Sequence, residues 1–204
     1  ISFLGALKKP SVVTFHSILP SPEAKLKAIV RSIAEKASGL VAMTNLSKEI
    51  LIREYGIAEE KISMIPHGIH SMSYTSSAKP KAALGLSKKV ILLTFGLLSR
   101  GKGIEYVIEA LPKVVNAHPD ILYIILGVTH PNILKEEGEN YRKFLIQKVH
   151  DLRLSSHVNF YNEYVSVDKL LHFLRAADIY ISTSLDPNQA VSGTFSYALG
   201  SGRS

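Results

Sequence analysis

Cysteine and tryptophan are absent from the 204-residue sequence. Without cysteine, the chain has no disulfide, no thiolate metal site and no thiol nucleophile. Long apolar runs are also missing, since none approaches the roughly 18–20 residues that span a membrane. No charged segment followed by an apolar core resembles a secretory signal near the start. We therefore expect a soluble protein whose chemistry depends on other side chains.

Acidic residues are fewer than basic ones, 17 against 24, so the net charge is +7. Such a surplus favours anionic partners: phosphates, an acidic membrane surface or nucleic acid. Nucleic acid is the least favoured, because the lysines are scattered and do not alternate with aromatic residues. Most lysines are better explained as solvated surface charge. Among the eight histidines only His67 and His70 are spaced as ligands, so no metal site is expected.

What the sequence does contain is an alternation of short apolar strands with helices whose apolar residues recur at helical spacing. The alternation predicts an α/β fold, a doubly wound parallel sheet with right-handed crossovers and helices on both faces. The strands are predicted at 11–16, 40–44, 62–66, 90–95, 121–127, 158–161 and 179–182.

Several local features follow from the same patterns. Asn45 or Ser47 is expected to cap the helix after the second strand. Residues 129–140 are expected to form a polar loop. The two helices that follow this loop are expected to turn apolar residues inward, namely Phe144, Leu145, Val149 and Leu152 in one and Val167, Leu170, Leu171 and Leu174 in the other.

The segment 89–111 combines a buried strand, a glycine-rich turn and an amphipathic helix. Backbone N–H groups and a helix N-terminus at such a turn bind anions, and Arg100 and Lys102 add positive charge. Gly96-x4-Gly101-Lys102 nearly matches the phosphate loop of nucleotide hydrolases, but Gly103 stands where Ser or Thr would bind Mg²⁺. ATPase or GTPase activity is therefore disfavoured. A plain strand-to-helix turn explains the pattern equally well.

Ligands bind beyond the carboxyl ends of the strands in open parallel sheets. Three loops meet there in the second half of the chain: 96–103, 127–131 and 185–193. In the last of them, Ser192, Gly193 and Thr194 precede an apolar helix, so their N–H groups and hydroxyls are suited to a diphosphate. An ordinary capped helix is the alternative.

The order and spacing of several short motifs resemble the GT-B glycosyltransferases of family 4, which are retaining and use nucleotide sugars. Gln189, Ser192 and Gly193 make the last loop most similar to a mannosyltransferase-like branch. The motifs are Thr14-Phe15-His16, Ile65-Pro66-His67-Gly68, Gly96 to Gly103, Ile108-Glu109-Ala110, Ile124-Ile125-Leu126-Gly127, Ala177-Asp178-Ile179-Tyr180 and Ala198-Leu199-Gly200-Ser201-Gly202.

The resemblance implies two Rossmann-like domains. Residues 1–70 would be the trailing part of the acceptor-side domain, and 89–204 would be most of the nucleotide-sugar donor domain. Residues 71–88, rich in Ser, Thr, Lys and Pro, would link them. The chain begins with Ile1 and stops at Ser204 without a closing element, so we expect it to be a fragment of a longer protein.

Site residues follow from the same resemblance. Lys102 matches the family's phosphate-binding lysine, whereas Leu97 replaces its arginine, and Arg100 is a hypothetical substitute for that arginine. The donor phosphates would thus be bound by Gly96, Arg100, Lys102, Gly103, Ser192, Gly193 and Thr194. The family's two glutamates fall on Gln189, suited to sugar hydroxyls, and Tyr197, at the ribose position. His16 matches the histidine at the reacting sugar; by itself it would be read as structural.

The implied activity is transfer of a hexose, with mannose from GDP-mannose as one option, to a glycan or lipid-linked acceptor in polysaccharide biosynthesis. The configuration would be retained, and no cofactor or metal is needed beyond the nucleotide sugar.

Two other functions are considered. One alternative is a nucleotide-binding module without transferase activity; another is an interaction domain. We expect a cytoplasmic location, with the inner face of the membrane as an option. Peripheral membrane association through the basic helix at 23–36 is a further option.

Overall fold

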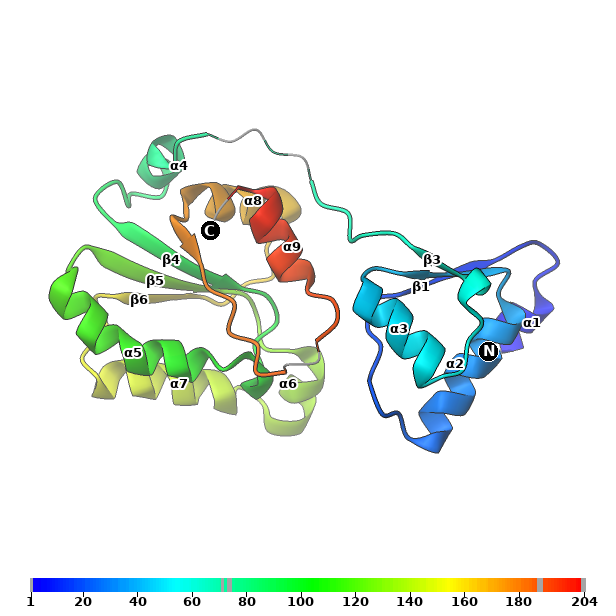
Figure 1. Cartoon of the computed structure of the whole chain (residues 1–204). Coiled ribbons are helices and arrows are strands. Elements are labelled where there is room, and N and C mark those ends of the chain that lie inside the picture. Colours follow the sequence, from blue (N-terminus) through cyan, green and yellow to red (C-terminus); the bar gives the residue numbers. More distant parts are fainter. Residues whose placement is uncertain (1, 71, 73–74, 187–188, 203–204) are drawn as a thin grey trace. The chain divides into compact units, whose positions relative to one another are not determined.

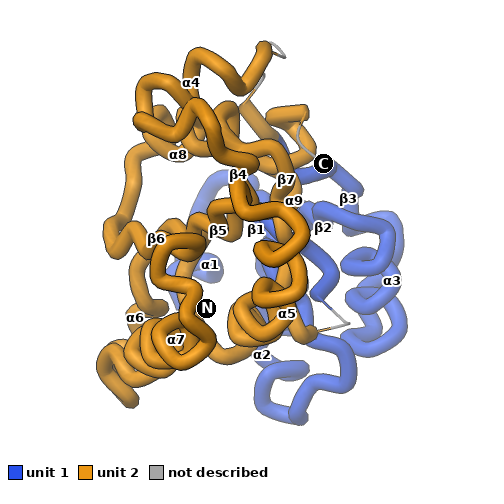
Figure 2. The backbone as a smooth tube through the Cα atoms, turned by 90° about the vertical axis from the view of Figure 1, so that its left-hand side faces the viewer, with its two compact units in different colours: residues 1–68, 187–193 blue, residues 69–186, 194–204 orange. Residues whose placement is uncertain are grey.

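The protein is described by a computed structural model that divides into two compact units (Figure 2). One unit comprises residues 1–68 with 187–193, and the other comprises residues 69–186 with 194–204. The described residues are 2–70, 72, 75–186 and 189–202. Parts of two predicted segments therefore lie outside the described residues: 71, 73 and 74 of the linker, and 187 and 188 of the last ligand loop.

The first unit contains a three-stranded parallel sheet in the order β1-β2-β3 (Figure 1). Its strands are β1 (Val12–Phe15), β2 (Gly39–Ala42) and β3 (Ile62–Met64). Its helices are α1 (Ser2–Ala6), α2 (Ala24–Lys36), α3 (Asn45–Arg53) and the 3-10 turn η1 (Glu59–Lys61). Apolar residues of the strands and of α2 and α3 form its core, among them Val30, Leu40, Ile50, Leu51 and Tyr55.

Helix α3 begins directly after Thr44, which is its N-cap. Thr44 has an extended backbone, and its hydroxyl oxygen accepts a hydrogen bond from the Ser47 N–H at 3.1 Å. This bond satisfies one of the unpaired N–H groups of the first turn. The prediction that Asn45 or Ser47 caps this helix was wrong, because both residues are already helical.

The second unit contains a four-stranded parallel sheet in the order β6-β5-β4-β7. Its strands are β4 (Val90–Phe95), β5 (Ile121–Leu126), β6 (Val158–Tyr161) and β7 (Ile179–Tyr180). Its helices are α4 (Ala78–Ala83), η2 (Arg100–Lys102), α5 (Ile104–Ala117), α6 (Pro131–Glu137), α7 (Asn140–Asp151), α8 (Val167–Ala176) and α9 (Gly193–Gly200). The predicted doubly wound α/β arrangement is confirmed.

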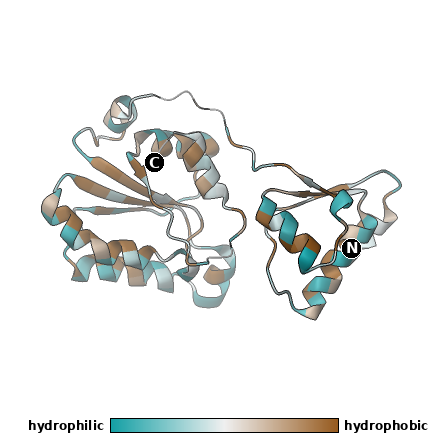
Figure 3. Ribbon diagram, in the orientation of Figure 1, coloured by the Kyte–Doolittle hydropathy of each residue, from teal (hydrophilic) through white to brown (hydrophobic). Residues whose placement is uncertain are grey.

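Alternate residues of the central strands enter opposite cores. Leu92, Tyr123 and Ile125 pack in a cluster with α5 and α7, whereas Ile91, Leu93 and Ile124 pack in a cluster with α8. Figure 1 shows α5 and α7 on one face of the sheet and α8 and α9 on the other. Because both faces are covered, the central strands β4 and β5 consist mostly of apolar residues, which the hydropathy colouring shows in brown (Figure 3). Among the described residues, no helix has the length and apolarity needed to cross a bilayer.

Three local predictions in this unit were wrong. The expected loop at 129–140 contains α6, which starts at Pro131, a residue whose fixed φ suits a first helical turn. Phe144 and Leu152 are 39% and 36% exposed, because the inward face of α7 is set by Tyr141, Arg142, Leu145 and Val149. Val167 is 44% exposed at the start of α8, where Phe173 is buried instead.

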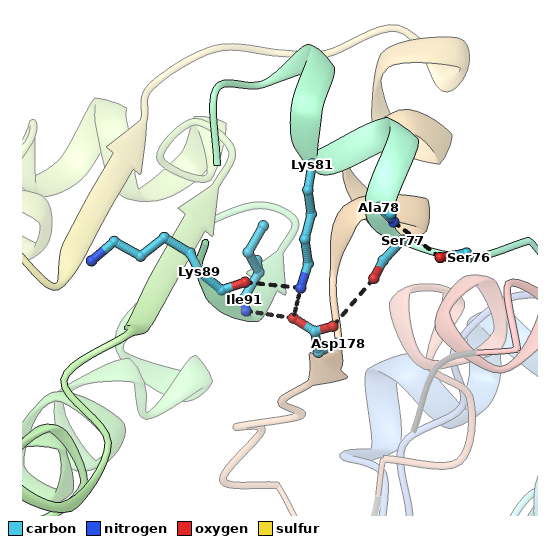
Figure 4. A network of polar contacts seen from close by, with 7 residues as sticks. All are labelled: Ser76, Ser77, Ala78, Lys81, Lys89, Ile91 and Asp178. Atoms are coloured by element: carbon cyan, nitrogen blue, oxygen red, sulfur yellow. Dashed lines mark hydrogen bonds and ion pairs between the residues drawn. The ribbon is translucent and has the colours of Figure 1, made fainter. Parts of the chain in front are cut away.

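A polar network attaches α4 to the sheet (Figure 4). Lys81 Nζ lies 2.5 Å from Asp178 Oδ2 and donates to the Lys89 carbonyl oxygen at 2.8 Å. Asp178 Oδ2 also accepts from the Ile91 N–H at 2.7 Å, and Oδ1 accepts from the Ser77 hydroxyl at 3.4 Å. The ion pair between Lys81 and Asp178 thus connects helix α4 to the start of β4 and to the residue before β7.

Candidate functional site

The turn after β4 approaches two later segments so closely that two of its positions require glycine. Gly96 has a φ of +120°, and a methyl group there would lie 3.1 Å from Thr194 Cγ2. Gly103 has a φ of +62°, and a methyl group there would lie 2.8 Å from the Thr183 carbonyl oxygen. L-residues with side chains rarely adopt these φ values. Gly96 and Gly103 therefore set the path of the turn.

Lys102 ends the η2 turn, and its ammonium group lies beside Gly96. A methyl group on Gly96 would be 4.0 Å from Lys102 Nζ. Burial lowers the pKa of the Lys102 ammonium below its ordinary value. Within the described ranges no hydrogen bond or ion pair involves Nζ. A half-buried ammonium that lacks a counter-ion favours an anionic ligand, which would offset the lost solvation.

Thr194 completes this cluster from the first turn of α9. Its hydroxyl oxygen accepts a hydrogen bond from the Tyr180 hydroxyl at 3.0 Å. Burial raises the pKa of Tyr180, so this hydroxyl remains a donor at neutral pH. The structure therefore brings three predicted residues together at the carboxyl end of β4, namely Gly96, Lys102 and Thr194.

The N-terminus of α5 already has a partner inside the protein. The Ile104 N–H donates to the Tyr141 hydroxyl oxygen at 3.3 Å, and that hydroxyl donates to Glu105 Oε2 at 2.5 Å. Burial, together with the Glu105 carboxylate, raises the pKa of Tyr141. Because this N–H is occupied, the anion-binding character of the turn depends more on Lys102 than on the helix end.

Arg100 is bound to the helices that follow β5. Its guanidinium carbon lies 5.6 Å from the Tyr141 ring centroid and 5.8 Å from the Phe144 ring centroid. Its Nε lies 3.6 Å from Glu137 Oε2. Both interactions are typical of a half-exposed arginine. These contacts engage Arg100 within the second unit, and its role in phosphate binding stays a prediction.

The remaining predicted donor residues are divided between the two units. Gln189, Ser192 and Gly193 belong to the unit that contains residues 1–68, whereas Tyr197 belongs to the other. Gln189 is exposed and donates to the Val191 carbonyl oxygen at 3.1 Å. Tyr197 packs against the core cluster of α8, with its ring centroid 5.8 Å from that of His70. A phenol in this position cannot act as a carboxylate acceptor toward ribose.

His16 follows β1 in the first unit, where it is exposed. Its ring centroid lies 6.4 Å from that of His67, and the two rings meet edge-on at 82°. The Nδ1 atom of His67 is hydrogen-bonded to the Gly68 carbonyl oxygen at 2.7 Å. Both histidines follow strands of one parallel sheet, so they lie at the same edge. Sequence reasoning identified His16 but did not pair it with His67.

The part of the chain that the structure describes contains no group of three or more His, Asp or Glu side chains placed to hold a metal ion. It does contain a polar cluster that sequence reasoning missed, formed by Thr129, Glu139 and Arg142. A signal for Arg142 was available. It stands three residues before Leu145 and seven before Val149, so helical spacing places it on the buried face of α7.

Two family models match the chain. "Glycosyl transferases group 1" matches residues 77–193, and "Glycosyltransferase Family 4" matches residues 1–71. The first match alone covers more than half of the sequence. The parallel α/β sheets of the two units agree with the GT-B fold.

Curated proteins and solved structures are also similar to this chain. A phosphatidyl-myo-inositol mannosyltransferase of Mycobacterium tuberculosis is 26% identical over 87% of this chain and 43% of its own length. The phosphatidylinositol N-acetylglucosaminyltransferase GPI3 subunit of Saccharomyces cerevisiae is 26% identical over 72% of this chain and 30% of its own length. The structure of Anabaena HepE in complex with UDP matches with a TM-score of 0.75 at 24% identity, over 96% of this chain and 52% of that one. The chain thus spans about half of these relatives or less.

Proposed function

This chain belongs to the group 1 glycosyl transferases, and we propose that it transfers a hexose from a nucleoside-diphosphate sugar to an acceptor hydroxyl, with retention of configuration. The observation that carries the proposal is the half-buried Lys102 ammonium beside Gly96, which has no counter-ion among the described residues. When the glycosidic bond breaks, negative charge grows on the departing diphosphate. An ammonium group fixed at that place stabilises this charge more in the transition state than in the ground state.

In this proposal, other predicted residues bind the diphosphate and the sugar of the donor. Thr194 and the backbone N–H groups of Ser192 and Gly193 would hold the diphosphate at the start of α9. Gln189 would bind hydroxyl groups of the sugar, and His16 would contact the reacting sugar. The departing phosphate would take the proton of the acceptor hydroxyl. No cofactor or metal is proposed besides the nucleotide sugar as co-substrate.

GDP-mannose is the first candidate donor, with mannose as the transferred sugar. The mycobacterial relative is a mannosyltransferase by name, and both curated relatives act on phosphatidylinositol lipids. HepE was solved with UDP and with UDP-glucose, which supports a nucleoside diphosphate but leaves the base open. A lipid-linked or glycan acceptor at the inner face of a membrane is therefore the proposed partner, with peripheral association through the basic face of α2.

Titration calorimetry of the full chain with GDP, UDP and ADP, followed by a transfer assay with GDP-mannose and UDP-glucose, tests this proposal. We expect one diphosphate to bind and Lys102→Ala to weaken its binding at least about tenfold, the loss typical of a charged hydrogen-bond partner. The matched control is Lys113→Ala, which removes an exposed lysine from α5. Failure of every nucleotide to bind would refute the proposal.

Replacements at the family's expected positions favour one alternative. Leu97 stands in place of an arginine, and Gln189 and Tyr197 stand in place of two carboxylates. A chain with these changes that bound a nucleotide but transferred no sugar to any acceptor would be a nucleotide-binding module. The same two assays separate this alternative from the enzyme, because they measure binding and transfer independently.

A further inference from the structure

Helix α7 buries an arginine beneath the turn that follows β5. Arg142 is 5% exposed; its Nη2 donates to the Gly127 carbonyl oxygen at 2.8 Å, and its Nε donates to Glu139 Oε2 at 3.1 Å. Its Nη1 atom is buried and has no hydrogen-bond partner among the residues that the structure describes. A buried guanidinium with an unpaired nitrogen stabilises a core less than an apolar side chain of similar size would. A role other than core stability therefore explains this residue better.

Glu139 extends this cluster to the other end of the same turn. Its Oε2 atom accepts from the Thr129 hydroxyl at 2.5 Å as well as from Arg142. Thr129 is 2% exposed, so this hydrogen bond lies inside the protein. Arg142 holds Gly127 directly and Thr129 through Glu139. The three-residue turn is thus held at both of its ends, at Gly127 by Arg142 of α7 and at the Thr129 side chain by Glu139, the N-cap residue of the same helix.

The turn at 127–129 is in close contact with the loop that carries Lys102. A methyl group on Gly127 would lie 2.1 Å from the Gly96 carbonyl oxygen, so the two backbones touch. The Leu98 N–H donates to the Val128 carbonyl oxygen at 2.9 Å, and the His130 N–H donates to the Leu98 carbonyl oxygen at 2.9 Å. A displacement of 127–129 must therefore displace 96–98 as well.

We propose that Arg142 is a positioning residue for the diphosphate site: through Gly127 and Thr129 it fixes the path of the loop from Gly96 to Lys102. This inference rests on the proposed function of that loop. Arg142 touches no ligand in this scheme. It acts on ligand binding because a preorganised loop loses less conformational freedom when the diphosphate binds.

The test compares Arg142→Met and Arg142→Lys with Val149→Ala in the full chain. Val149 is buried on the same helix, two turns beyond Arg142, so Val149→Ala destabilises α7 without touching the turn. We expect the dissociation constant of GDP or UDP to rise about tenfold in both Arg142 variants, since a hydrogen bond to a charged group is lost from the loop support. We expect it to stay unchanged in Val149→Ala at a temperature where all variants are folded.

Hydrogen–deuterium exchange provides a measurement that needs no ligand. The Leu98 and His130 N–H groups should exchange faster in Arg142→Met than in the wild type or in Val149→Ala, because their hydrogen bonds join the two loops. If Arg142→Met does not fold, Glu139→Gln is measured in the same way, since it keeps the shape but weakens the bonds to Thr129 and Arg142.

The outcomes separate this inference from the function on which it rests. A wild-type chain that binds neither GDP nor UDP refutes the proposed function, and exchange at Leu98 and His130 then decides whether Arg142 supports the loop. A wild-type chain that binds, combined with unchanged affinity and unchanged exchange in Arg142→Met, overturns the positioning role alone. Equal losses of affinity in Arg142→Met and Val149→Ala also overturn it, because they would reflect general destabilisation.

Discussion

Lys81 of helix α4 and Asp178, the residue before β7, form an ion pair with 2.5 Å between Nζ and Oδ2. The same carboxylate accepts from the Ile91 N–H, so it also holds the start of β4. Lys81 is mostly buried, so breaking the pair costs free energy of folding. Because Asp178 is partly exposed, this cost is smaller than for a fully buried pair.

Asp178→Ala is therefore expected to lower the free energy of unfolding by about 2 kcal/mol, because it leaves a mostly buried ammonium and a backbone N–H without their acceptor. The matched control is Glu109→Ala, which removes the exposed partner of Lys148 and should cost less than about 1 kcal/mol. Urea unfolding followed by circular dichroism measures both. Equal costs for the two variants would contradict the structural role assigned to Asp178.

Gly127→Ala is expected to destabilise the protein by about 3 kcal/mol or more, because the added methyl group would collide with the Gly96 carbonyl oxygen at a φ of +140°. Gly138→Ala is the control, since Gly138 has a φ of +63° but open space around it. It should cost less, about 1–3 kcal/mol, the backbone strain of a positive φ combined with a ψ of −140°. Thermal unfolding of the two variants side by side tests whether the contact, rather than the backbone conformation, dominates.

Nucleotide affinity is expected to fall at alkaline pH. Burial lowers the pKa of Lys102 in the free protein, and a bound diphosphate would favour its charged form. Affinity is then complete below the lowered pKa and decreases by up to about tenfold per pH unit above it. Calorimetry with GDP or UDP from about pH 7 to about pH 10 measures this decrease, and Lys102→Arg, which stays charged, should show none. An identical decrease in Lys102→Arg would rule out Lys102 as its cause.

The same pKa has a consequence for stability with a defined sign. Between the lowered folded pKa and the ordinary pKa of about 10.4, the unfolded chain holds more protons at Lys102 than the folded chain. The contribution of Lys102 to stability therefore rises as the pH rises through this window. Lys102→Met should raise the melting temperature at neutral pH while it weakens nucleotide binding, as Lys102→Ala does. A lower melting temperature would show that the ammonium has a partner in the folded protein.

Glu137→Gln is expected to increase diphosphate affinity by up to about threefold, because an exposed ion pair worth less than about 1 kcal/mol no longer competes for Arg100. Arg100→Gln in the same background should remove the gain. Calorimetry of the single and double variants forms a thermodynamic cycle. If Glu137→Gln leaves the affinity unchanged, Arg100 makes no contribution to phosphate binding.

The sequence predicted the structure well wherever the spacing of apolar residues determines the secondary structure. The apolar runs of β4 and β5 and the stripe of α5 predicted the doubly wound sheet, and glycine content located the turn after β4. The sequence was least informative where a polar residue is buried by a partner far along the chain. Helical spacing places Arg142 on the buried face of α7, but nothing near it in the sequence indicates that Gly127, 15 residues earlier, receives one of its donors. Thr44 was overlooked as a cap because its extended backbone is a property of the strand before it.

The contact between Gly96 and Gly127 also limits how this protein can be redesigned. A side chain on Gly127 would collide with the Gly96 carbonyl oxygen, and one on Gly96 would press on Thr194 Cγ2, so a library aimed at a new nucleotide preference should leave both glycines fixed. Leu97 and Val128, their neighbours in the chain, are partly exposed and can vary without that collision. Substitutions at these two positions could change the nucleotide preference while the ends of β4 and β5 keep their spacing.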